Sequence, residues 1–250
     1  MRTVVRGVLT ILGMEGLAGI LTAETWSRLI AAGIARVFEP GWVLMDQGAP
    51  ADHVVVVLDG RVKLTKVDAQ GNTLVLAIRG PGELVGELGL LQPDRRRTAT
   101  VTAVDRCSTR VVPLDEFTTL ARDLGLERRI LEHVARRLQN GEDVRADLSV
   151  RSAGGRVLST LLRLAVPNRR VPVGGPGRDR PTGSGSSSSS SNGVGIDIRI
   201  SQAELATAAG VNRATVAAEL RKLRDDGVVL TSRGRIDVVD VAELRRRADE

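Results

Sequence analysis

The sequence predicts an α+β protein with an N-terminal β-roll of the jelly-roll type, a long helix and a C-terminal winged helix-turn-helix. Three patterns indicate this class: short β-type runs between residues 42 and 114, an apolar heptad pattern after residue 127, and two capped helices followed by a β-hairpin after residue 200. We therefore expect a β-rich domain at 1–126, a connecting helix at 127–151 and a winged domain at 152–250.

A short helical region is expected before the β-roll. Residues 1–36 have a helical pattern, in which Thr22 can cap a helix that carries Trp26, Leu29 and Ile30 on one face. Pro40-Gly41 ends this pattern. The β-type runs follow, separated by turn signals such as Asp59-Gly60, at Val54–Leu58, Val62–Val67, Leu74–Ile78, Thr98–Val104 and Ser108–Pro113.

The long helix carries a candidate dimer seam. Residues at alternating spacings of three and four form a heptad pattern over about three repeats, and they are Leu131, Val134, Leu138, Gly141, Arg145 and Leu148. We expect a homodimer joined through Leu131, Val134, Leu138 and Leu148. Because Gly141 and Arg145 interrupt the seam, the alternative is a helix that packs on its own β-roll.

The helix-turn-helix is predicted at Ser201–Leu223. Ser201 and Glu204 match a capping box, Gly210 suits the left-handed end of the first helix, and Asn212 can cap the second. A helix pair around such a turn is the DNA-binding helix-turn-helix, whose second helix enters the major groove. The alternative is an amphipathic helix pair in another kind of helical protein.

The elements around this helix pair follow from simpler patterns. Strand-like runs at 227–230 and 235–239 would form a wing, and residues 240–250 a charged terminal helix. A further amphipathic helix is expected at 153–166. Residues 167–195 are rich in Pro, Gly and Ser, and we expect a disordered insertion to which no function is assigned.

The second helix of the pair begins with Arg213. An arginine that donates two hydrogen bonds to a guanine edge is the commonest specific contact to DNA. We therefore expect Arg213, with Asn212 and Thr215 beside it, to lie at the groove of double-stranded DNA. Phosphate contacts are expected from Ser201, Gln202, Arg221 and Arg233.

Composition favours a polyanionic partner and excludes several classes of protein. The net charge is +6, and with a single cysteine an intrachain disulfide is impossible and a Cys-ligated cluster is close to excluded. We interpret His133 as an ordinary polar residue of a helix. Neither a nucleophile–base pair nor a metal cluster indicates an enzyme, and no apolar run reaches the ~20 residues that span a bilayer. The expected location is the cytoplasm, without a membrane partner.

A candidate ligand site lies in Gly82–Ala99. A Gly-rich turn before a short helix directs backbone N–H groups at an anion, Arg97 can pair with a phosphate, and Glu87 can accept from a ribose hydroxyl. The expected ligand-binding residues are Gly86, Glu87, Leu88, Arg97 and Thr98. The alternative is a surface turn followed by a basic run.

Taken together, these motifs resemble the cyclic-AMP receptor protein / FNR (Crp–Fnr) family of transcription regulators. The matching residues are Gly41, Gly60, the run Gly82–Gly89, Arg97-Thr98-Ala99, Ala135–Gln139 and Ser201–Leu223. The resemblance implies a cyclic-nucleotide-binding β-roll, a homodimer and DNA binding. It also makes RNA polymerase a candidate partner.

Departures from the family pattern concern the ligand and the operator. Gly141-Glu142 stand where the resemblance implies a Thr-Ser pair that reaches the adenine, and Ala214 and Ala218 replace two base-reading side chains. The effector therefore remains open between cyclic AMP, another cyclic nucleotide and none, and no cofactor is expected. The alternatives are a ligand-independent DNA-binding regulator and, more remotely, a regulatory subunit or enzyme that does not bind DNA.

Overall fold

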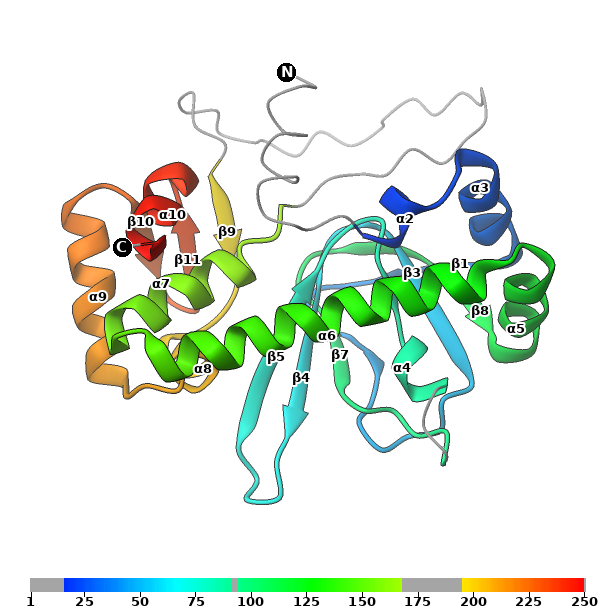
Figure 1. The fold of residues 1–250 in the computed structure, drawn as a ribbon, viewed down its shortest axis with the longest axis horizontal. Coiled ribbons are helices and arrows are strands. Elements are labelled where there is room, and N and C mark those ends of the chain that lie inside the picture. Colours follow the sequence, from blue (N-terminus) through cyan, green and yellow to red (C-terminus); the bar gives the residue numbers. More distant parts are fainter. Residues whose placement is uncertain (1–15, 91–93, 168–194, 250) are drawn as a thin grey trace.

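The computed structural model describes residues 16–90, 94–167 and 195–249, in which one long helix runs from a β-roll to a small winged domain (Figure 1). The expected disordered insertion lies outside these ranges except at its two ends, as do residues 1–15. Within the described ranges, no helix combines the length and apolarity needed to cross a membrane.

The β-roll consists of two antiparallel four-stranded sheets that pack around a core of small aliphatic residues such as Val55, Val57 and Val62. Most predicted strands are confirmed. One sheet has the order β1 (Ile34–Phe38), β8 (Cys107–Pro113), β3 (His53–Asp59) and β6 (Leu84–Val85). The other has the order β2 (Val43–Met45), β7 (Thr100–Ala103), β4 (Val62–Val67) and β5 (Thr73–Arg79).

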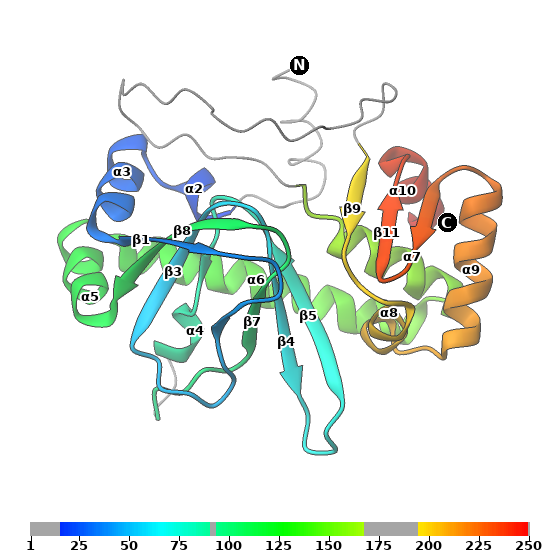
Figure 2. The ribbon, with the colours of Figure 1, turned by 180° about the vertical axis from the view of Figure 1, so that it is seen from behind.

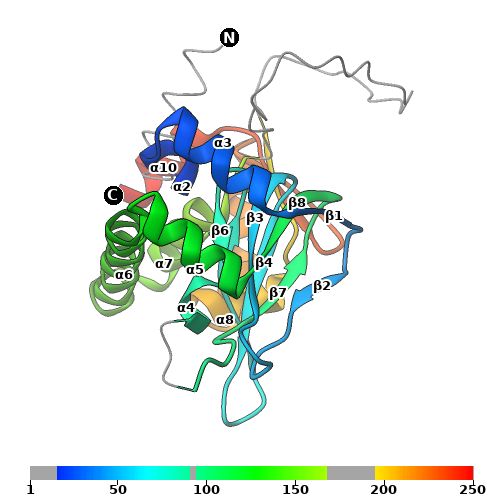
Figure 3. The same cartoon turned by 90° about the vertical axis from the view of Figure 1, so that its right-hand side faces the viewer.

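Helices cover the outer face of the first sheet (Figure 3). They are α2 (Leu17–Ile20), α3 (Ala23–Ala32) and α5 (Leu114–Asp123). The predicted cap is confirmed, because the Thr22 side chain accepts from the Thr25 N–H at 3.2 Å, and Trp26, Leu29 and Ile30 are buried. The expectation of helix up to residue 36 is wrong, since Gly33 ends α3 and Ile34 begins β1.

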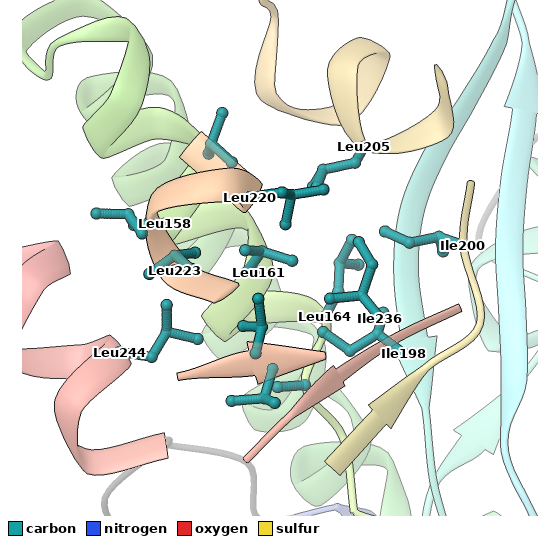
Figure 4. Packing of buried hydrophobic residues seen from close by; sticks show 14 of the residues in the cluster. Leu158, Leu161, Leu164, Ile198, Ile200, Leu205, Leu220, Leu223, Ile236 and Leu244 are labelled. Carbon is teal, nitrogen blue, oxygen red and sulfur yellow. The ribbon is translucent and has the colours of Figure 1, made fainter. Parts of the chain in front are cut away.

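The winged domain is built around a continuous aliphatic core (Figure 4). Its helices are α7 (Ala153–Leu164), α8 (Gln202–Ala209), α9 (Arg213–Asp225) and α10 (Val241–Asp249). Its sheet has the order β10 (Val229–Ser232), β11 (Arg235–Val238) and β9 (Ile196–Ile198). The predicted hairpin is therefore present, and β9 adds a third strand that the sequence patterns did not indicate.

The two domains are in direct contact. Helix α8 packs on β5 (Figure 2). Val75 and Ile78 of the β-roll join the core of the winged domain. Arg61, which is 1% exposed, bonds Asp105 of the β-roll at 2.6 Å and Asp197 of β9 at 2.6 Å. On the outer face of β4, Lys63 pairs with Glu204 of α8 at 2.6 Å.

The connection between the domains is α6 (Leu126–Val150), the longest helix of the described chain. It passes along the β-roll and reaches α7 in the winged domain (Figure 1).

Candidate nucleotide and DNA sites

A tight turn between β6 and the short helix α4 (Glu87–Leu90) forms the centre of the candidate ligand site. Gly86 has a φ of +95°, and a Cβ atom placed there would lie 2.7 Å from Nη1 of Arg97 and 2.7 Å from Cε of Met45. Only glycine fits both this backbone conformation and this space. The absence of a side chain lets Arg97 approach the turn, and its Nη1 donates to the Gly86 carbonyl at 3.3 Å.

Arg97 is a buried cation with an exchangeable partner. The residue is 4% exposed, and its Nη2 donates to Oδ1 of Asp52 at 3.1 Å. The Asp52 side chain is 74% exposed, so water stabilises its charge whether or not Arg97 is near. Burial lowers the pKa of Arg97, and the Asp52 charge opposes this shift. This guanidinium could therefore pair with a phosphate in place of Asp52.

The other expected ligand residues lie around this turn. Thr98 is half-buried directly after Arg97, whereas Leu88 is 38% exposed. Glu87 is 3% exposed and forms an ion pair with Nη1 of Arg137 on α6. The same guanidinium bonds Oε2 of Glu83 at 2.5 Å, so one arginine joins both carboxylates to the long helix.

Glu83 and His133 extend this charged cluster into the interior. Nε2 of His133 lies 3.2 Å from Oε2 of Glu83, and the two residues are 3% and 8% exposed, respectively. Burial alone would raise the pKa of Glu83, but the hydrogen bond with His133 and the charges of Arg137 and Arg79 lower it to about 2. His133 is thus a residue of α6 as expected, and it is buried beside a carboxylate partner.

The expected dimer seam divides into two groups on α6. Leu131 and Leu138 are 58% and 65% exposed, and they are available to a second protomer. Val134 is 8% exposed and is buried within its own chain. Leu148 belongs to the part of α6 whose side chains lie outside the described structure. Gly141 is exposed, and a Cβ atom there would meet nothing within 4 Å.

The helix-turn-helix has the predicted caps. Ser201 and Glu204 form the complete capping box, and the Asn212 side chain accepts from the Thr215 N–H at 2.8 Å and from the Thr215 hydroxyl at 3.0 Å. Three of the residues expected to contact DNA, Ser201, Asn212 and Thr215, thus have capping roles as well.

The remaining expected DNA contacts are on the surface of the winged domain. Arg213 and Arg221 are exposed on α9, whereas Val216, Leu220 and Leu223 of the same helix are buried. Gln202 is exposed at the start of α8, and Arg233 is exposed at the turn of the wing. Arg224 donates to the Thr231 hydroxyl at 2.9 Å, which joins α9 to the wing.

Comparisons with known proteins assign both domains. A cyclic nucleotide-binding domain matches residues 35–123, and a Crp-like helix-turn-helix domain matches residues 155–247. The cyclic AMP receptor protein of Thermus thermophilus is 29% identical over 215 residues, which cover 85% of this chain and 87% of that protein. A CRP-like cAMP-activated global transcriptional regulator of Mycobacterium tuberculosis is 26% identical over 214 residues, covering 84% and 86%.

Solved structures agree in fold. The c-di-GMP-responsive global regulator of Xanthomonas campestris has a TM-score of 0.62 at 22% identity, over 88% of this chain and 100% of that one. A CRP/FNR-family transcriptional regulator from Thermus thermophilus has a TM-score of 0.61 at 24% identity, over 87% and 99%. Because both domain models match this chain, and because the curated relatives are similar over most of their length, this chain belongs to the Crp–Fnr family of DNA-binding transcription regulators.

Proposed function

We propose that the protein is a homodimer whose affinity for an operator is set by a cyclic nucleotide bound in the β-roll. The observation that carries this proposal is Arg97, a buried guanidinium beside the Gly86 turn whose carboxylate partner is exposed. In the bound state the phosphate would take the place of Asp52, and Glu87 would accept a hydrogen bond from the ribose. The names of the two curated relatives, which refer to cyclic AMP, support a ligand of this class.

The coupling between ligand and DNA would run through α6. Glu87 is paired with Arg137 on this helix, so a ligand that contacts Glu87 changes the interactions of Arg137. Since α6 leads into the winged domain, its position affects the spacing of the two α9 helices in a dimer. The dimer would have two arrangements that differ in this spacing, and the ligand shifts the population between them only by its different affinity for each.

The proposed domain division is a sensor domain at 1–126, a dimerisation helix at 127–151 and a DNA-binding domain at 152–250. Two protomers joined through Leu131 and Leu138 would present two copies of Arg213 to successive major grooves. A two-fold symmetric protein of this kind reads a pseudo-palindromic operator. RNA polymerase is the natural further partner of such a regulator, and the cytoplasm, where bacterial chromosomal DNA lies, its place of action.

The test begins with calorimetric titration of the purified dimer with cyclic AMP and with cyclic GMP. Arg97→Ala is expected to abolish the binding heat, because the phosphate loses the buried cation beside the Gly86 turn. Arg96→Ala is the matched control, since Arg96 is exposed and donates to the Gly48 carbonyl instead. Bound fragments are then selected from genomic DNA with and without the nucleotide that binds.

Three results would contradict parts of this proposal. A monomer by sedimentation at working concentration excludes the dimer. If neither cyclic AMP nor cyclic GMP produces binding heat, the alternative is favoured, which is a regulator that binds DNA independently of a ligand. Equal binding of both nucleotides by Arg97→Ala and the wild type excludes Arg97 as the phosphate ligand.

A further inference from the structure

Arg79, the last residue of β5, lies on the inner face of the β-roll. The register pairs Arg79 with Val62 and Ala77 with Leu64. Directly paired residues of antiparallel strands share one face of the sheet. Val62 is 0% exposed and belongs to the core between the two sheets, so Arg79 extends from that face as well. The neighbouring Lys63 is on the opposite face, where it pairs with Glu204.

The Arg79 guanidinium is not satisfied by the protein itself. Its Nε is buried and has no hydrogen-bond partner in the described part of the chain. Burial lowers the pKa of Arg79, the charge of Arg137 lowers it further, and the charges of Glu83 and Glu87 oppose these effects. These two carboxylates are therefore near, but Arg137 takes their direct hydrogen bonds. A buried polar group without a partner is costly, and a ligand with a hydrogen-bond acceptor would satisfy it.

The site contains a group for each of the three parts of a nucleotide. Arg97 contacts Gly86, Glu87 follows Gly86 in the turn, and Glu87 pairs with Arg137. Arg79 ends β5, and the turn that follows it leads to Glu83, whose carboxylate bonds Arg137 of α6. The charges of Arg137, Glu83 and Glu87 all act on Arg79, so its guanidinium lies near this ion-paired cluster. If Arg97 holds the phosphate and Glu87 the ribose, the base extends toward Arg79.

We infer that Arg79 reads the base of the nucleotide and selects guanine over adenine, an inference that depends on the proposed nucleotide-binding function. Guanine presents two acceptors on one edge, O6 and N7, which match two donors of one guanidinium. Adenine presents the N7 acceptor beside the N6 amino donor, which would face another donor. The second guanidinium donor then lacks an acceptor and is repelled by the N6 amino donor. The site therefore disfavours adenine as well as favouring guanine.

Calorimetric titration with three cyclic nucleotides tests this inference. Wild-type protein is expected to bind cyclic GMP at least about tenfold more tightly than cyclic AMP. Cyclic inosine monophosphate, which has O6 and N7 but lacks the 2-amino group, is expected to bind like cyclic GMP. Arg79→Met should remove the preference by weakening cyclic GMP and cyclic IMP about tenfold while leaving cyclic AMP equal or tighter. Arg79→Lys, which keeps the charge but loses the paired donors, should also reduce the preference.

The controls separate this inference from the proposed function. Lys66→Met changes an exposed residue of β4 and should leave all three affinities unchanged, and thermal unfolding verifies that each variant folds. If no nucleotide binds the wild type, the proposed nucleotide-binding function fails and the inference with it. If cyclic AMP binds as tightly as cyclic GMP, or if Arg79→Met weakens all three equally, only the assignment of Arg79 is overturned.

Discussion

The ionised carboxylate of Glu83 makes the folded state sensitive to acid. Its pKa is lowered from 4.5 to about 2, so the folded state binds a proton less readily than the unfolded chain. The resulting stability is fully present above about pH 4.5, and it is lost as the pH falls toward 2. At one pKa unit per 1.36 kcal/mol, the contribution is on the order of 3 kcal/mol.

We predict that Glu83→Gln destabilises the protein by on the order of 3 kcal/mol at pH 7, because the amide resembles the protonated acid. The difference from the wild type should shrink as the pH is lowered below 4.5. Denaturant unfolding at a series of pH values measures both quantities. Glu39→Gln, which changes an exposed carboxylate paired with Arg106, is the control. A difference that stays constant with pH would contradict the ion-pair account.

Sequence reasoning found the residues of the candidate site whose chemistry is local. Gly86, Glu87 and Arg97 lie within one short segment, and an anion site needs a glycine turn and a cation there. Glu83, Arg137 and Arg61 were missed because their partners are 44 to 136 residues away in sequence. A charged residue in a pattern does not reveal which opposite charge the fold places beside it.

The turn between β6 and α4 depends on Gly86 for two separate reasons. Its φ of +95° is strained for any other residue, and a Cβ atom would displace Arg97, whose Nη1 is 2.7 Å from that position. We predict that Gly86→Ala weakens cyclic-nucleotide binding at least about tenfold, because Arg97 loses its position for the phosphate. Calorimetry on the folded variant measures the loss.

Gly71→Ala is the matched control for this turn. Gly71 also has a positive φ, of +83°, but a Cβ atom there would meet nothing within 4 Å. Both variants should lose about 1 kcal/mol of stability from backbone strain. Only Gly86→Ala should lose nucleotide affinity, and equal affinities of the two variants would show that Gly86 is needed for the backbone alone.

Elements with a complete local pattern were predicted well, and short ones were not. The run Val62–Val67 coincides with β4, and the capped helix after Thr22 with α3. Strand β6 has two residues and β9 three, which is too few for a periodicity to be visible. The dimer seam was predicted from heptad spacing alone, but spacing does not indicate that Val134 packs within its own chain.

At the scale of the whole molecule, Arg61 forms a buried polar link between the two domains. Besides Asp105 and Asp197, it donates to the Val166 carbonyl at 3.2 Å, so a single guanidinium contacts the β-roll, the segment after α7 and the wing sheet. Removing one partner of a buried ion pair typically costs about 3–5 kcal/mol. The cost at Asp197 should be smaller, since its side chain is 22% exposed and Asp105 remains to pair with Arg61.

We predict that Asp197→Asn lowers the free energy of unfolding by roughly 2 kcal/mol and separates the unfolding of the winged domain from that of the β-roll. Scanning calorimetry detects both changes. Asp237→Asn is the matched control, because Asp237 pairs with Asp197 in register on the same sheet but forms its ion pair with Arg235 of the same strand. Asp237→Asn should leave a single unfolding transition for the two domains. If the two variants unfold alike, the link through Arg61 does not couple the domains, and α6 together with the packing of α8 on β5 must carry the coupling between nucleotide and DNA.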